Sequence, residues 1–200
     1  MGYGDLIEPV SKLNEVINLL EGLEYEVHTM ADDGYDYLSA ESHRCIHLKN
    51  KAGKELFIGF EDEFSLFFDA WHTHYFGYEK EFEAMRCDLK SILNNTAYPI
   101  IVRCKGKCMG SMLIRNEVLS KETAKGKVIS LLHAPEFINR MNEDGIVVSL
   151  VFWNSDLDSE IIFEPGEFNE QADNEKSVNR MDINEPVMDT DDSLNMVDNK

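Results

Sequence analysis

The most constraining feature of this sequence is a series of short apolar segments, joined by turns, between residues 42 and 76. The segments SHRCIHLKN (42–50) and KELFIGFED (54–62) flank the tripeptide KAG, whose glycine favours a tight hairpin turn. The next segment, EFSLFFDAWHTHYF (63–76), forms either a third strand or a bent pair of strands. Parallel neighbours would need crossover connections of about a dozen residues, and these turns are too short for that. The series therefore predicts an antiparallel meander.

Helices and further strands flank this meander. Apolar residues at helical spacing predict helices over residues 9–20, 78–95 and 135–141. In the second of these helices the apolar face consists of Phe82, Met85, Leu89 and Ile92. Other apolar segments predict strands over residues 23–30, 97–104, 108–118 and 146–153, the last of them well buried. The order of elements predicts an α+β fold, with a mostly antiparallel sheet packed on one side by helices.

The acidic charge of the chain is concentrated toward its C-terminal end. The 200 residues carry a formal net charge of −19. From residue 154 onward there are 14 Asp and Glu against 3 Lys and Arg, a net charge of −11. Large apolar residues are sparse there, so folding could not bury enough surface to offset the loss of conformational entropy. We expect a single domain over residues 1–163 and a disordered acidic tail over residues 164–200.

Composition also bounds the partners and the location of the protein. A net charge of −19 argues against binding to nucleic acid or to an anionic membrane surface, both of which require basic residues. The N-terminal sequence MGYGDLIEPV has neither the basic nor the apolar region of a secretory signal. Four cysteines in a chain of this length do not form a disulfide framework. We therefore expect a cytoplasmic protein that prefers basic protein partners.

The histidines provide one hypothesis about function. Residues two apart on a strand point to the same face, so His72 and His74 share a face, and so do His43, Cys45 and His47. If these strands were neighbours, up to four imidazoles and a thiol could converge on a zinc, iron or copper ion. The alternative is that the imidazoles of HTHY are solvated or hydrogen-bonded at a strand edge. The sequence contains no nucleophile elbow, phosphate-binding loop or dinucleotide fingerprint, and we expect no catalytic set and no cofactor.

A mixture of acidic and aromatic residues over positions 61–79 provides a second hypothesis. If residues 63–75 formed one strand, Asp69, Trp71 and Tyr75 would lie on the same face. Tryptophan and tyrosine are common anchors in protein interfaces, and carboxylates beside them would attract a basic partner. The predicted partner-binding residues are Glu61, Asp62, Glu63, Asp69, Trp71, Tyr75, Tyr78 and Glu79. The alternative is that Trp71 and Tyr75 belong to the core.

The stretch ELFIGFEDEFSLFFDAWHTHY, followed by a helix such as EKEFEAMRCDLKSIL and a hairpin such as IIVRCKGKCMGSMLI, resembles the immunity proteins of bacterial polymorphic-toxin systems. The resemblance covers about residues 55–115 and is one of layout. It implies a small α+β cytoplasmic protein that binds and neutralises a cognate toxin domain, and it implies no catalytic residues. The leading hypothesis is therefore a non-catalytic immunity protein with a basic toxin domain as its partner. A histidine-ligated metalloprotein or metalloenzyme is the alternative, and partner binding by the acidic tail is a third possibility.

Overall fold

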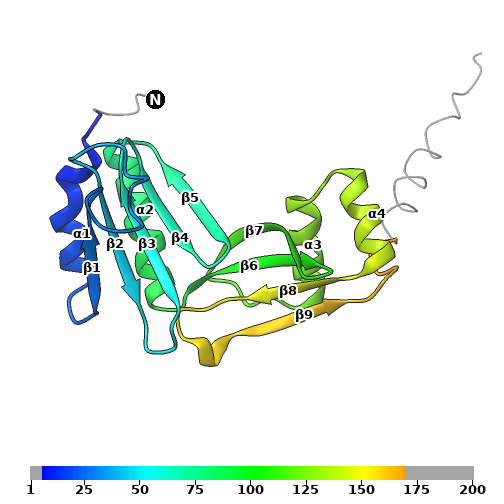
Figure 1. Cartoon of the computed structure of the whole chain (residues 1–200). Coiled ribbons are helices and arrows are strands. Elements are labelled where there is room, and N and C mark those ends of the chain that lie inside the picture. Colours follow the sequence, from blue (N-terminus) through cyan, green and yellow to red (C-terminus); the bar gives the residue numbers. More distant parts are fainter. Residues whose placement is uncertain (1–5, 170–200) are drawn as a thin grey trace, which may run out of the picture. The chain divides into compact units, whose positions relative to one another are not determined.

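The computed structural model describes residues 6–169, and within them the chain forms nine strands in two antiparallel sheets together with four α-helices (Figure 1). This arrangement confirms the predicted α+β class and the predominance of antiparallel pairing. The division of the strands between two sheets was not indicated by the sequence.

The first sheet is the meander predicted from residues 42–76, extended by one strand at its N-terminal edge. Its five strands are paired in sequence order, each antiparallel to the next. They are β1 (Tyr25–His28), β2 (Arg44–Lys49), β3 (Glu55–Phe60), β4 (Phe64–Phe68) and β5 (Trp71–Tyr75). The segment 63–76 is thus a pair of strands, and its turn consists of Asp69 and Ala70.

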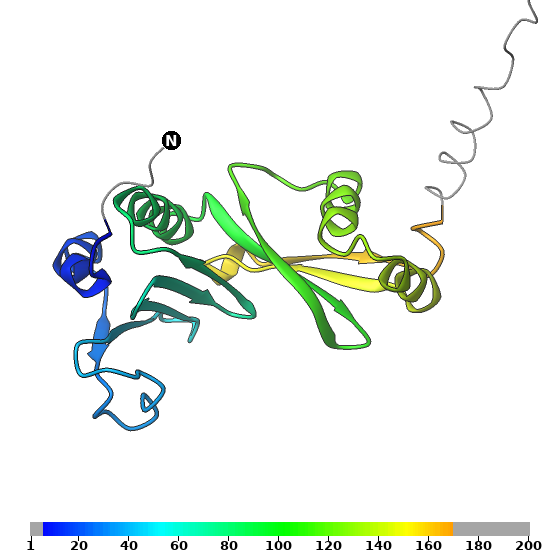
Figure 2. The same ribbon diagram turned by 90° about the horizontal axis from the view of Figure 1, so that it is seen from above.

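One face of this sheet is covered by helices, as expected. The short 3-10 helix η1 (Pro9–Lys12), α1 (Leu13–Leu19) and α2 (Glu79–Leu93) contribute side chains to the core beneath the sheet. The predicted apolar face of α2 is fully buried there against phenylalanines of β3 and β4. Seen from above, α1 and α2 lie on one side of the sheet, and the segment between β1 and β2 lies on the other (Figure 2).

The second sheet has the strand order β7-β6-β8-β9. Its strands are β6 (Ala97–Cys104), β7 (Lys107–Arg115), β8 (Ile146–Leu150) and β9 (Ser159–Phe163), and it packs with α3 (Lys121–Leu131) and α4 (Pro135–Asp144). Helix α3 and strand β9 were not predicted. Burial also differs from expectation, because β8 alternates between buried and half-buried residues, whereas β6 is buried along almost its whole length.

Strand β6 is buried on both faces because it lies between two cores. Ile101 belongs to the core of the first sheet, while Ile100 and Val102 pack in the second core with α3 and α4. A buried network also joins the two sheets. The Asp88 carboxylate on α2 accepts a hydrogen bond of 2.6 Å from the Tyr75 hydroxyl of β5 and two of 2.6 Å from the Arg115 guanidinium of β7.

The compact unit continues past the predicted boundary at residue 163. Phe168 is 2% exposed and packs against Phe163. The predicted disordered acidic tail lies, from residue 170 onward, outside the described residues. Within residues 6–169, no helix combines the length and the apolar character that crossing a bilayer requires.

Candidate functional site

The candidate site lies on the face of the first sheet that points away from α1 and α2, which we call the outer face. The strand register assigns side chains to this face because successive residues alternate and directly paired residues share a face. Its residues are Glu26, His28, Cys45, His47, Lys49, Glu55, Phe57, Gly59, Ser65, Phe67, His72 and His74.

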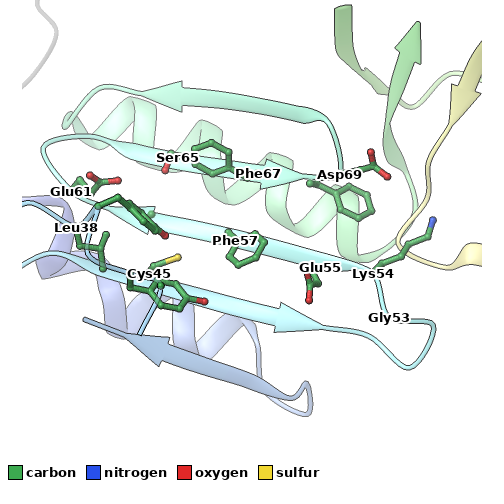
Figure 3. A pocket seen from close by; sticks show the side chains of 15 residues that line it. Leu38, Cys45, Gly53, Lys54, Glu55, Phe57, Glu61, Ser65, Phe67 and Asp69 are labelled. Carbon is green, nitrogen blue, oxygen red and sulfur yellow. The ribbon is translucent and has the colours of Figure 1, made fainter. Parts of the chain in front are cut away.

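A hollow of about 950 Å³ lies on this face (Figure 3). Its floor contains Phe57 and Phe67, which are directly paired between β3 and β4, and its wall includes Tyr35, Tyr37 and Leu38 from the segment between β1 and β2. The segment between β1 and β2 therefore converts a flat sheet surface into a concave one.

Aromatic rings continue across the whole outer face. Tyr35 stacks on His28 with ring centroids 3.9 Å apart, and His47 stacks on Phe57 at 4.3 Å. Phe67 is 5.5 Å from the His72 ring and 5.9 Å from the His74 ring. Phe67 remains 38% exposed and Tyr37 55% exposed. Phe57 and Phe67 lie on β3 and β4, which are paired on both sides, so these two rings need little ordering on binding.

Carboxylates lie at both ends of the hollow. Glu61, in the turn between β3 and β4, lines one end, and Glu55 and Asp69 line the other (Figure 3). Lys54 also lines the hollow, but its ammonium group donates to Asp158 at 2.6 Å and to the Phe152 carbonyl at 2.5 Å. Asp69 lies 3.7 Å from Arg103. The hollow therefore combines an aromatic floor with three carboxylates, of which Glu55 also bonds Lys49 at 3.2 Å.

The hollow contains one potentially reactive group, the thiol of Cys45. Cys45 is 2% exposed, and this burial raises the pKa of its thiol above the ordinary value. A raised pKa keeps the sulfur protonated at neutral pH, and the thiol is a much weaker nucleophile than the thiolate. Cys45 is therefore a buried residue with a protonated thiol and not an activated nucleophile.

The structure corrects the predicted role of the two aromatic anchors. Trp71 is 5% exposed and Tyr75 is 6% exposed, and both lie in the core beneath the sheet. The error came from treating residues 63–75 as one strand. The hairpin turn at Asp69–Ala70 pairs Phe68 with Trp71, which places Trp71 on the same face as Phe68. Neither residue is available as a surface anchor.

The predicted acidic residues do not form one patch. Glu61 and Asp69 line the hollow, whereas Asp62 projects from the turn and lies 3.7 Å from His43. Glu63 pairs with His74 of β5 at 2.7 Å. On the helical side of the sheet, Tyr78 caps the N-terminus of α2, and Glu79 bonds Lys12 at 3.0 Å. Of the eight predicted residues, Glu61 and Asp69 belong to the hollow.

The predicted convergence of histidines is also wrong in its stated form. His72 and His74 share a face as predicted, and the strand register places His47 on the same outer face. However, β2 and β5 are separated by two strands, and adjacent strands lie about 4.8 Å apart, so the two pairs remain far from each other. His43 lies just before β2, where it is buried beside Ser39. His47 lies instead beside Glu26 and His28 of β1.

Sequence reasoning missed the residues that form most of the hollow. Phe57 and Phe67 lie inside nearly continuous apolar segments, ELFIGF and FSLFF, in which the outward residues look like the inward ones. Gly59 and Ser65 could have identified them. They lie two residues from Phe57 and Phe67 on the same strands, so they share the outer face, and a small or polar residue is typical of the face that is not turned to the core. Tyr35 and Tyr37 lie between the predicted strands 23–30 and 42–50, and nothing in the sequence showed that this segment folds over the sheet.

Comparison with protein-family models, with curated protein sequences and with solved structures gave no significant match.

Proposed function

We propose that this protein is a non-catalytic binding protein whose hollow holds a basic partner protein, and that the partner is a toxin domain that the protein neutralises. The observation that supports the proposal best is the combination of an exposed aromatic floor with carboxylates at both ends of the hollow. Aromatic anchors supply most of the binding free energy in many interfaces, and charges at the rim select the partner and speed association.

The size of the hollow suits a projecting loop or side chains of a partner. The strands that form its floor span about 17–20 Å, at roughly 3.4 Å per residue. A long side chain with a positive end could lie on Phe57 and Phe67 while its charge reaches Glu61 or Asp69. Lysine and arginine combine an apolar stem with a charged end in this way, and arginine also stacks on aromatic faces.

The charge of the chain as a whole supports the same class of partner. With a formal net charge of −19, the protein attracts basic surfaces over a distance of about 8–10 Å at physiological ionic strength. Proteins that act on nucleic acids carry basic surfaces of this kind. An acidic protein with a concave aromatic face is therefore suited to cover the functional surface of such a toxin.

Affinity capture from the source organism tests the proposal. Three baits are used at low and at moderate salt: the wild-type chain, the double variant Phe57→Ala/Phe67→Ala, and the control Val118→Ala, which truncates a 95% exposed residue remote from the hollow. We expect a basic protein in the wild-type and Val118→Ala eluates at low salt, less of it at moderate salt, and none with the double variant.

A second step tests neutralisation. Expression of the captured protein should arrest growth of a host cell, and coexpression of the wild-type chain should restore it, whereas the double variant should not. Two results would contradict the proposal: equal capture by all three baits, or a purified chain whose hollow already holds a tightly bound small molecule in native mass spectrometry.

A further inference from the structure

At the edge of the outer face, next to the hollow, β1 and β2 bring together two imidazoles and a carboxylate. Glu26 and His28 lie two apart on β1 and so share a face, and Glu26 is directly paired with His47 on β2. The ligating atoms of Glu26, His28 and His47 all lie within 4.8 Å of one another. We propose that these three residues bind a divalent transition-metal ion of the zinc class.

The distances between the donor atoms fit this proposal. A tetrahedral zinc ion binds nitrogen and oxygen at about 2.0–2.2 Å, which sets its ligand atoms roughly 3.3–3.5 Å apart. The distance from His28 Nε2 to Glu26 Oε2 is 3.3 Å. Glu55 of β3 lies nearby, with its Oε1 3.6 Å from His47 Nε2, and could serve as a fourth ligand if it released its 3.2 Å hydrogen bond from Lys49. Small side-chain rotations would bring these atoms around one ion.

The two ring nitrogens that face the cluster have no hydrogen-bond partner. His28 Nε2 and His47 Nε2 are both buried from solvent, and neither makes a hydrogen bond. Buried polar atoms are normally satisfied, whereas these two nitrogens have only carboxylate oxygens near them, at 3.3 Å and 3.6 Å. A bound metal ion would satisfy both nitrogens at once, because each would donate its lone pair to the ion.

The other groups around the cluster orient the imidazoles as a metal site requires. The Tyr35 hydroxyl oxygen lies 3.4 Å from His47 Nδ1, so it can accept a hydrogen bond from Nδ1–H and leave the lone pair of Nε2 free to ligate. The Tyr35 ring also stacks on His28, and Phe57 stacks on His47. These contacts fix the planes of both imidazoles, which reduces the entropy lost when the ion binds.

The donor set defines the class of ion. Two imidazoles and one or two carboxylates suit Zn²⁺ and its neighbours Co²⁺, Ni²⁺ and Cu²⁺. Mg²⁺ and Ca²⁺ prefer sites made of oxygen atoms alone, so they should not compete. Nothing in this assignment depends on the proposed function, because metal binding is measured on the isolated chain without any partner.

The second histidine pair of the outer face provides a matched control. His72 and His74 share a face as His28 and His47 do, but they are exposed, and His74 Nδ1 pairs with Glu63 at 2.7 Å. The test is calorimetric titration of the full chain with Zn²⁺, repeated with Co²⁺ by following its visible absorption. It uses the wild type, the single variants Glu26→Gln, His28→Ala, His47→Ala and Tyr35→Phe, and the double variant His72→Ala/His74→Ala.

We expect the wild type and the His72→Ala/His74→Ala variant to bind about one equivalent of Zn²⁺. His28→Ala and His47→Ala should weaken binding by roughly 100-fold or more, and Tyr35→Phe by roughly 10-fold, as is typical of residues that orient metal ligands. Zn²⁺ should raise the thermal unfolding temperature of the wild type and of the His72→Ala/His74→Ala variant, but not that of His28→Ala or His47→Ala.

Circular dichroism of each variant in the presence of a chelator shows whether it folds. Glu26→Gln changes an exposed residue of the edge strand, so it reports on ligation even if His47→Ala disturbs the stack on Phe57. The proposal is overturned if the folded wild type binds no stoichiometric Zn²⁺. It is equally overturned if the His72→Ala/His74→Ala variant loses as much affinity as His28→Ala.

Discussion

The two faces of the first sheet both carry phenylalanine side chains, but these side chains differ in burial. The face toward the helices carries Phe60, Phe64 and Phe68, which are at most 1% exposed, whereas the outer face carries Phe57 and Phe67, which remain partly exposed. The inner phenylalanines are covered by α1 and α2. The same type of side chain therefore stabilises the core on one face and stays partly exposed to solvent on the other.

The largest expected effect comes from the inner face. Phe64→Ala removes a fully buried ring that packs against Phe60 and Phe82, and it should lower the free energy of unfolding by about 3–5 kcal/mol. Urea denaturation followed by circular dichroism measures this change. A loss below about 1 kcal/mol would mean that the two faces do not differ in the way described.

The next effect concerns the buried network behind β5. Burial, together with the hydrogen bond to Asp88, raises the pKa of the Tyr75 hydroxyl. Above about pH 10 the tyrosine of the unfolded chain ionises while that of the native chain does not, so its contribution to stability is complete below that pH and is lost as pH rises.

Tyr75→Phe should therefore cost about 1–2 kcal/mol at pH 7 and should also flatten the decline of stability at alkaline pH, by up to ~1.4 kcal/mol per pH unit. Denaturant titrations at pH 7, 9.5 and 11 would measure both terms. An identical alkaline decline in the variant and the wild type would show that Tyr75 titrates normally.

A smaller effect is expected from the outer face. Phe67→Ala truncates a ring that is partly solvated and touches His72 and His74, so it should change the free energy of unfolding by less than about 1 kcal/mol. It is the matched control for Phe64→Ala, since both residues lie on β4 and face opposite sides. A loss above ~2 kcal/mol would assign Phe67 to the core and not to a binding surface.

The smallest effect is a change in association rate. Glu61→Lys reverses a charge that lines the hollow, and it should slow association with the basic partner by about 3–10-fold at low salt, with little effect on stability. Glu79→Lys introduces the same change of charge on the helical side of the sheet, where Glu79 bonds Lys12. Stopped-flow measurements that found equal slowing by both variants would show that only the net charge matters.

The sequence was sufficient to predict the meander, the apolar face of α2 and the α+β class, because each depends on local spacing. Helix α3 was missed because it buries only Ala124 and Val128, which is too few apolar residues to give a helical pattern. Its first turn is stabilised by a capping box at Ser120 and Thr123, but threonine replaces the usual glutamate or glutamine, so the motif was not recognised. Strand β9 was missed because its segment SEIIF lies where the acidic composition begins.

The candidate site was harder to predict because it depends on register. One hairpin turn, at Asp69–Ala70, moved Trp71 and Tyr75 from the outer face to the core. The cluster of Glu26, His28 and His47 exists because β1 pairs with β2 in one particular register, and no local pattern in the sequence specifies that register. Parity within each strand was predictable from the sequence, but the order of the strands decides that His47 meets β1 and not His72 and His74.

The decisive quantity is the dissociation constant between the captured partner and the Phe57→Ala/Phe67→Ala variant. It is compared with the dissociation constants of the wild type and of Val118→Ala for the same partner. If the outer face of the first sheet is the binding surface, the double variant should bind at least about 30-fold more weakly, equivalent to ~2 kcal/mol, and Val118→Ala should bind as the wild type does. If the folded double variant binds the partner as tightly as the wild type does, the outer face of the first sheet is not the binding surface.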